Sequence, residues 1–315
     1  MPEYRGVRVL VLGGTGFIGR QVTRQLGRAG ASLHLAARTP EGAAGALARL
    51  GVTGIPLQAD LSRPGAAAAL LQSVRPAVTF NLAGYGVDPL ERDPSEAERI
   101  NHTLVAELVE AAGSLRSPDW PGQDLVHAGS AAEYGAATGP LREDTPGDPI
   151  SLYGRTKLAG TDAVARATGA GRVRAIGVRL FTVYGPGERS GRLLPSIIEA
   201  ARAGRDLPLT SGEQRRDFTY VGDVAEGLLR LGLVGSPVPG PVNLATGRLE
   251  SVRRFAERAA AVVGLAAERL RFGELPGRPD EMAHGAVSIA RFRELCGWLP
   301  ATTIEEGVRR TLHSL

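Results

Sequence analysis

The sequence predicts an α/β fold with a doubly wound parallel sheet, followed by a smaller C-terminal α/β region. Short apolar runs alternate with helical periodicity through residues 1–180. Strands separated by helices need crossover connections, which produce a parallel sheet covered on both faces. After Leu180 the segments are shorter and turn residues are more frequent. The 315 residues therefore predict a first domain over 1–180 and a second region over 181–315, with segments near 215–245 returning to the first domain.

Each element of the first domain follows from its apolar pattern. Continuous β-type runs predict strands, and apolar residues at helical spacing predict helices. The expected strands are 7–12, 32–37, one beginning at 53–56, 77–82, 125–128 and 174–180. The expected helices are 17–26, 41–50, 66–74, 95–112 and 153–167. Residues 114–123 and 131–149 are expected to be loops, the first of them a surface insert.

The composition excludes several classes of protein. Hydrophobic residues make up 43% and charged residues 22%, so the chain can bury a core. We find no apolar run near the roughly 20 residues of a membrane span, and the chain starts with a polar turn that leads directly into a strand, so we expect no signal peptide. Cys296 is the single cysteine, which excludes an internal disulfide and a Cys-based metal cluster. We expect a soluble, cytoplasmic protein without a metal.

The charge pattern does not favour a nucleic acid or a membrane as partner. The formal net charge is only +4, and acidic residues are interspersed along the chain. Anionic small molecules remain compatible with this balance.

A glycine-rich turn follows the first strand. Gly13, Gly16 and Gly19 allow a tight turn, a close approach of the backbone to a pyrophosphate, and close contact between helix and strand. The helix N-terminus adds free N–H groups and the positive end of its dipole. This strand–turn–helix context predicts a dinucleotide site, the alternative being a tight turn without a ligand. The candidate cofactor-binding residues here are Gly13, Thr15, Gly16, Phe17, Ile18 and Gly19.

The end of the second strand favours NADP over NAD. A carboxylate at this position would hold the ribose 2′-hydroxyl of NAD, but the strand ends at Arg38. A guanidinium can hold a 2′-phosphate instead. The competing interpretation is that Arg38 stacks on adenine or points into water. Five further strand-end positions complete the predicted cofactor path: Asp60-Leu61 beside the adenine, and Leu82, Ala83 and Gly84 where the cofactor passes.

The position of the single lysine predicts a catalytic pair. The chain has 37 Lys and Arg residues, and Lys157 is the only lysine among them. It follows Tyr153 by four residues at the start of a predicted helix, so the two side chains share one helix face. A nearby ammonium lowers the pKa of a phenol, and Tyr153 can then act as acid or base. We therefore expect Lys157 to act on Tyr153 and to reach the cofactor ribose.

Ser130 completes the predicted catalytic group. It ends the fifth strand, at the carboxyl edge where such sheets bind ligands. Its hydroxyl can donate to a substrate carbonyl oxygen, and the competing interpretation is a capping serine. Beside Tyr153 and Lys157 we favour the catalytic role.

Together these motifs resemble the extended short-chain dehydrogenase/reductase family, in particular its nucleotide-sugar epimerase, dehydratase and 4-ketoreductase branch, which has a Rossmann fold. The resemblance covers nearly the whole chain. It rests on GGTGFIG, Tyr153-x-x-x-Lys157, RLFTVYGPG from Arg179, RDFTYV from Arg216, and the late Arg278-Pro279.

The resemblance implies roles for individual residues. It implies a catalytic triad of Ser130, Tyr153 and Lys157, and Arg216 and Arg278 holding the diphosphate of a nucleotide-diphosphate sugar. Asn101 either supports the proton relay or is a buried structural residue. The resemblance also implies a homodimer formed through the helices at 95–112 and 153–167.

The resemblance also bears on which reaction of the branch this chain catalyses. In the dehydratases and decarboxylases of the branch, acidic or polar residues follow the catalytic Ser or Thr. Here Ala131 and Ala132 stand at those positions and cannot transfer protons, so the resemblance disfavours dehydration and decarboxylation. Glu133 is either structural or a contact to a sugar hydroxyl, as its resemblance to deoxy-sugar reductases implies. Thr182 stands where related chains carry Asn beside the substrate.

The sequence therefore predicts NADPH-dependent reduction of the 4-keto group of a nucleotide-linked 4-keto-6-deoxy sugar. The first alternative is an NAD-dependent 4-epimerase. The second, from another class, is a non-catalytic nucleotide-binding subunit.

Overall fold

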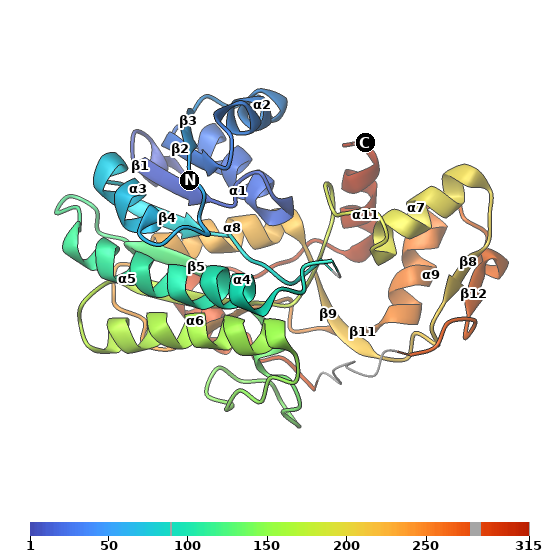
Figure 1. Ribbon diagram of the computed structural model, residues 1–315. Coiled ribbons are helices and arrows are strands. Elements are labelled where there is room, and N and C mark those ends of the chain that lie inside the picture. The colour runs from blue at the N-terminus through green and yellow to red at the C-terminus, as the bar shows by residue number, and fades with distance from the viewer. Residues whose placement is uncertain (89, 278–284, 315) are drawn as a thin grey trace.

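The computed structural model describes residues 1–88, 90–277 and 285–314. Its centre is a seven-stranded sheet in which every neighbouring pair is parallel (Figure 1). Across the sheet the strands follow the order β10 (Val242–Leu244), β6 (Ala175–Leu180), β5 (Leu125–Ser130), β4 (Val78–Asn81), β1 (Arg8–Leu12), β2 (Ser32–Ala37) and β3 (Ile55–Gln58). The predicted doubly wound parallel sheet is confirmed.

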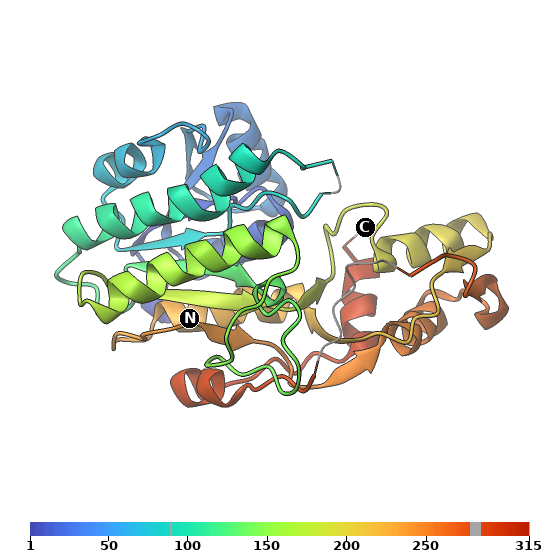
Figure 2. The same cartoon turned by 60° about the horizontal axis from the view of Figure 1, so that its bottom comes forward.

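Helices cover both faces of this sheet. One face packs against α1 (Phe17–Arg28), α2 (Pro40–Leu50) and α8 (Val221–Gly232), and the other against α3 (Ala66–Val74), α5 (Leu104–Ser114) and α6 (Leu152–Gly169) (Figures 1 and 2). In β1, Val9 and Val11 join the apolar core on the first side, and Leu10 and Leu12 join the core on the second. Because successive side chains of a strand point to opposite faces, a continuous apolar run is what a sheet buried on both sides requires.

A smaller part lies to one side of the main sheet (Figures 1 and 2). Its strands are β7 (Thr182–Tyr184), β9 (Arg215–Tyr220) and β11 (Leu249–Ser251) in one sheet, and β8 (Leu207–Leu209) with β12 (Leu270–Phe272) in another. Its helices are α7 (Leu193–Ala203), α9 (Val252–Val263) and α11 (Ile304–Leu312). Phe218 of β9 stacks on Phe255 of α9 with ring centroids 4.1 Å apart, so the small sheet and its helix share a core. Between β9 and β11 the chain returns to the main sheet as α8 and β10.

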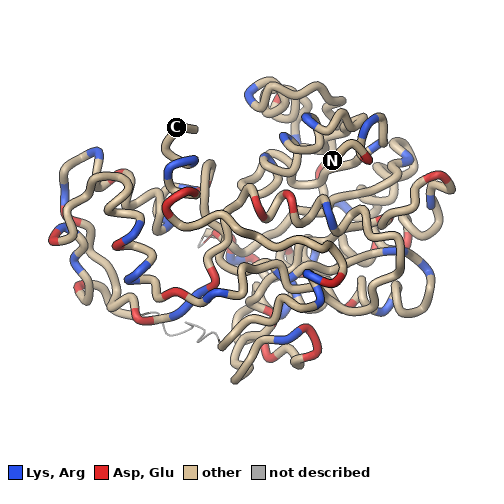
Figure 3. Tube along the Cα trace, turned by 180° about the vertical axis from the view of Figure 1, so that it is seen from behind, with Lys and Arg blue, Asp and Glu red and all other residues tan. Residues whose placement is uncertain are grey.

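The structure also has short helical elements outside these layers. Single turns of 3-10 helix lie at Pro2–Tyr4 and Ala267–Arg269, and α10 (Ala290–Cys296) packs near β10 and α8. Basic and acidic residues are interspersed over both parts of the molecule (Figure 3). Among the described residues, none of the helices is both long and apolar enough to cross a membrane.

The long helix expected at 95–112 is not uniform. It consists of α4 (Pro94–Glu98), a π-helical turn at Arg99–Thr103 and α5, which continues to Ser114. The π turn places Asn101 in the interior, where its Nδ2 donates to the carbonyl oxygen of Tyr85 at 2.8 Å and to Oγ1 of Thr156 at 2.9 Å. The spacing of apolar residues does not reveal one extra residue in a helical turn, so the sequence did not predict the π turn.

The segment 114–123 is not a simple surface insert. Trp120 and Gln123 are buried, and Trp120 Nε1 donates to the carbonyl oxygen of Gln123 at 2.8 Å. Gln123 Nε2 donates to the carbonyl oxygen of Ser236 at 2.9 Å, and Arg174 donates to that of Trp120 at 2.8 Å. The segment therefore joins β5 to the chain that follows α8.

Candidate active site

A cleft opens at the carboxyl ends of β1, β4 and β5. The chain order reverses between β1 and β4, and ligands of open α/β sheets bind at such a switch point. The cleft has a volume of about 300 Å³, and its walls come from the glycine turn, the ends of β4, β5 and β6, and the start of α6. It is lined by Gly13, Gly16, Phe17, Ile18, Gly19, Leu82, Ala83, Gly84, Val87, Ala128, Gly129, Ser130, Tyr153, Lys157, Leu180, Phe181, Val183 and Arg192.

The glycine turn has the shape that a dinucleotide pyrophosphate needs. Gly13 has a φ of +71°, and a Cβ there would lie 2.7 Å from the backbone nitrogen of Ala83. A Cβ on Gly19 would lie 2.1 Å from the carbonyl oxygen of Gly13. Gly16 forms the N-cap of α1 without a side-chain hydrogen bond to the first turn, so the helix presents its N-terminal N–H groups to the cleft. These features fit a nicotinamide dinucleotide.

The predicted adenosine end of the path lies outside this lining. Thr15 and Arg38 are exposed, and Arg38 follows directly after β2. The Asp60 carboxylate accepts hydrogen bonds from the backbone N–H of Ser62 at 3.1 Å and from its hydroxyl at 2.7 Å. These bonds lower the pKa of Asp60. Leu61 packs beside the core under α3 and α5.

Ser130 and Tyr153 meet at the cleft. Ser130 is the last residue of β5, and Tyr153 lies in the first turn of α6. Burial raises the pKa of Tyr153 to about 12, while a hydrogen bond with Ser130 acts in the opposite direction. The phenol therefore carries its proton at neutral pH. Its arrangement beside a second hydroxyl is suited to donating that proton to a carbonyl oxygen between them.

Lys157 does not lower the pKa of Tyr153 as predicted. Its Nζ donates to the carbonyl oxygen of Ala128 at 2.5 Å, and the side chain is buried. Burial lowers the pKa of Lys157 to about 8, and Glu133 acts against this shift. Sharing one helix face brought both residues to the cleft, but burial decides the pKa of the phenol. Lys157 lines the cleft, where an ammonium can still reach a ribose hydroxyl.

Asn101 and Glu133 both lie behind the cleft wall. Asn101 is fully buried, and its side chain joins the backbone of Tyr85 to Thr156. Glu133 is fully buried too, and its carboxylate contacts Arg179, so it has no exposed edge to offer a sugar hydroxyl. For both residues the arrangement favours the structural alternative over direct contact with a ligand.

A second cavity adjoins the cleft in the smaller part of the molecule. It has a volume of about 410 Å³ and shares Val183 and Arg192 with the first. Thr182 and Arg216, both predicted substrate residues, line it. Arg278 lies outside the described residues. Sequence reasoning missed Arg192, which lies between the two cavities and acts on Tyr153; in a chain this rich in arginine nothing marks it out.

The chain belongs to the NAD-dependent epimerase/dehydratase family, whose model matches residues 9–245. Within it, the chain falls in the extended short-chain dehydrogenase/reductase branch, as the motifs predicted.

Individual relatives cover nearly the whole chain. The dTDP-6-deoxy-L-talose 4-dehydrogenase (NAD(P)(+)) of Kitasatospora kifunensis is 33% identical, over 98% of this chain and 95% of its own. The UDP-glucose 4-epimerase of Azospirillum brasilense is 29% identical, over 96% and 90%. The structure of MoeE5 in complex with UDP-glucuronic acid and NAD aligns with a TM-score of 0.80 at 26% identity, over 97% of this chain and 98% of that one.

Proposed function

We propose that this protein is an NADPH-dependent reductase of the 4-keto group of a 4-keto-6-deoxy sugar linked to a nucleoside diphosphate. The observation that carries the proposal is the Ser130–Tyr153 pair in the cleft, with the phenol protonated at neutral pH. Reduction of a ketone needs a proton donor at the developing alkoxide, and Tyr153 is in that state without further change.

The residues of the cleft have separate tasks in this reaction. When bound, the nicotinamide supplies the hydride that the carbonyl carbon receives. Ser130 donates to the carbonyl oxygen, and Tyr153 transfers its proton to that oxygen. Lys157 holds the ribose by its ammonium. Arg192 and Arg216, which line the second cavity, bind the diphosphate by charge-assisted hydrogen bonds.

Two observations support the choice of reaction and cofactor. Ala131 and Ala132 follow Ser130 in a turn of 3-10 helix and carry no group for a second proton transfer, which disfavours dehydration. Arg38 is exposed at the end of β2, where it can meet a 2′-phosphate. The Kitasatospora relative is named as using either nicotinamide cofactor, so NAD is the alternative.

The second candidate is a 4-epimerase, which the Azospirillum relative favours. An epimerase oxidises and re-reduces the same sugar, so its cofactor returns to its starting state and can stay bound.

One experiment separates the two. The purified protein is denatured and the released nucleotide is quantified, and the native protein is assayed with NADPH, and in parallel NADH, against UDP- and dTDP-linked 4-keto-6-deoxy sugars. Stoichiometric NADPH consumption in the presence of the keto sugar supports the reductase. Stoichiometric release of NAD⁺, together with interconversion of 4-epimers without net cofactor use, supports the epimerase and contradicts our proposal.

A further inference from the structure

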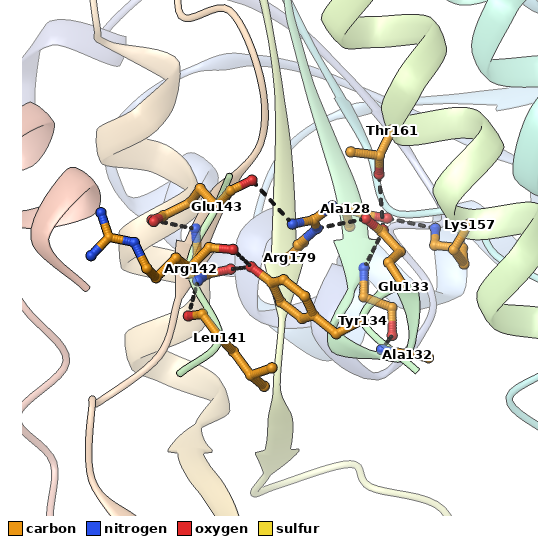
Figure 4. A network of polar contacts seen from close by, with 12 residues as sticks. Ala128, Ala132, Glu133, Tyr134, Leu141, Arg142, Glu143, Lys157, Thr161 and Arg179 are labelled. Carbon is orange, nitrogen blue, oxygen red and sulfur yellow. Dashed lines mark hydrogen bonds and ion pairs between the residues drawn. The ribbon is translucent and has the colours of Figure 1, made fainter. Parts of the chain in front are cut away.

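Glu133 lies at the centre of a buried polar network behind the catalytic cleft (Figure 4). Its carboxylate accepts three hydrogen bonds: from the backbone N–H of Ser130 at 2.8 Å, from the hydroxyl of Thr161 at 2.9 Å and from Nε of Arg179 at 2.8 Å. All three partners are donors, so the side chain acts as a carboxylate. Burial raises its pKa, and the Arg179 guanidinium acts in the opposite direction.

These contacts connect Glu133 to the residues that do the chemistry. Ser130 is held twice, because its N–H donates to Glu133 and its own hydroxyl oxygen accepts from the N–H of Ala132 at 3.1 Å. Thr161 lies one helical turn after Lys157 on α6. The network therefore fixes the end of β5 against the helix that carries Tyr153 and Lys157.

The backbone leaves room for this carboxylate only because residue 129 is glycine. A Cβ on Gly129 would lie 2.6 Å from Oε1 of Glu133 and 2.8 Å from Oγ1 of Thr161. The carboxylate therefore sits against the strand itself, one residue before Ser130. Arg179 pairs with Gly129 in the sheet register, which places its guanidinium on the far side of Glu133 from Lys157 (Figure 4).

We propose that Glu133 is a positioning residue for the proposed reductase: its buried carboxylate holds the Ser130 backbone and, through Thr161, the helix that carries Tyr153 and Lys157, and its negative charge acts on the Lys157 ammonium. This role rests on the proposed function, since it concerns the same catalytic group. In this role Glu133 does not contact the substrate, and it does more than form a structural ion pair with Arg179.

The charges around the site are consistent with this role. Glu133 opposes the effect of burial on Lys157, and it raises the pKa of Tyr153, which keeps the phenol protonated. His127 of β5 is buried beside Lys157, and its pKa is lowered well below the ordinary value by burial and by that lysine, so it is neutral. The other charged groups facing these side chains are Arg179 of β6, Glu143 of the loop after η3 (Ala131–Glu133), Glu91 of the loop after β4, and Arg192 before α7.

The test uses the fact that Lys157 is the only lysine. Protein labelled with ¹³C-lysine has one ε-methylene signal, and its chemical shift reports the charge of Nζ as the pH is raised. In the wild type we expect a transition near pH 8. In Glu133→Gln the transition moves to lower pH. The matched control is Glu143→Gln, which removes a neighbouring carboxylate from the same network and leaves the transition in place. An unmoved transition in folded Glu133→Gln overturns the proposal.

Two further variants keep the test decisive. If Glu133→Gln does not fold because Arg179 is left buried and unpaired, the double variant Glu133→Gln/Arg179→Met removes both charges. Its lysine transition is expected to fall as well, because Glu133 is the charge that acts on Lys157. Glu133→Asp keeps the charge but shortens the reach to Ser130, so its transition stays close to the wild type while kcat falls.

Activity provides the second measurement. For Glu133→Gln we expect kcat to fall between about tenfold and a hundredfold with KM for the sugar nucleotide little changed, because the reacting groups are misplaced rather than removed. A fall in affinity with unchanged kcat overturns the positioning role. The lysine titration needs neither substrate nor cofactor. It therefore stays informative if the wild type reduces no 4-keto sugar, in which case the proposed function fails and the link between Glu133 and Lys157 is still decided.

Discussion

Lys157 donates a hydrogen bond of 2.5 Å from Nζ to the carbonyl oxygen of Ala128, at the point where β5 enters the cleft. The lysine is thus anchored on the strand that ends in Ser130, and Tyr153 is acted on by Ser130, Glu133, Arg192 and Glu91. The two residues of the Tyr-x-x-x-Lys motif both line the cleft, but different neighbouring groups act on their pKa values.

This arrangement predicts the pH dependence of reduction. Burial lowers the pKa of Lys157 to about 8, so the ammonium loses its proton as the pH rises through that value. We expect kcat/KM for NADPH to fall above about pH 8, while Tyr153, with a pKa of about 12, stays protonated throughout that range. A pH profile of kcat/KM for NADPH checks this, because kcat/KM reports the pKa values of the free enzyme. A constant kcat/KM up to about pH 10 contradicts a role for the charged lysine.

We expect replacement of Tyr153, the proposed proton donor, to abolish most of the turnover. Tyr153→Phe removes the hydroxyl but keeps the ring, and we expect kcat to fall by about 10² to 10⁴ because general acid catalysis is lost. Cofactor binding is retained, as quenching of intrinsic fluorescence by NADPH measures. Turnover at the wild-type rate would show that another group donates the proton.

We expect Arg38 to decide between NADPH and NADH. Arg38→Ala is expected to raise KM for NADPH about tenfold and to leave KM for NADH within about twofold, because only the former has a 2′-phosphate. Arg28→Ala, which removes an exposed arginine at the far end of α1, is the matched control. An equal rise in KM for NADPH and NADH would indicate that Arg38 stacks on the adenine ring instead.

The glycine turn is sensitive to a single methyl group. Gly19→Ala places a Cβ 2.1 Å from the carbonyl oxygen of Gly13, so the turn must open, and we expect cofactor affinity to fall at least about tenfold. Gly169→Ala, at the end of α6, has no atom within 4 Å of the new Cβ and serves as control. Its stability is expected to change by less than about 1 kcal/mol. Calorimetric titration with NADPH measures the affinity, and unchanged binding by Gly19→Ala refutes the prediction.

A buried ion pair outside the cleft contributes to stability. Arg174 and Asp124 pair at 2.7 Å with side chains 8% and 4% exposed, so Asp124→Ala leaves a buried guanidinium unpaired. We expect a loss of about 3–5 kcal/mol in the free energy of unfolding. Asp144→Ala breaks a pair with Arg142 in which the side chains are 76% and 65% exposed, and should cost under about 1 kcal/mol. Urea unfolding of both variants measures these free energies. Equal losses in the two variants contradict the prediction.

Much of the fold could be predicted because its signals are local. The run Val9–Leu12 is apolar at every position, as a strand buried on both faces requires, and helix 66–74 begins and ends at the predicted residues. The π turn at Arg99–Thr103 and the burial of Trp120 were missed, since neither changes the apolar period. Within the first, Asn101 forms a hydrogen bond with Thr156, 55 residues away.

The sequence by itself determined the glycine-rich strand–turn–helix, whose shape fits a dinucleotide, and the spacing that brings Tyr153 and Lys157 to one helix face, because both are properties of neighbouring residues. Only the tertiary structure decided the pKa values of these groups and the charges that lie beside them. Burial raises the pKa of the phenol, and Glu133 is joined to Arg179 across 46 residues. Arg192 lies between two cavities, in the loop from β7 to α7, at a position that no local sequence pattern indicates. Desolvation and charge pairing depend on what is packed within a few ångströms, and packing joins residues that are distant in the chain.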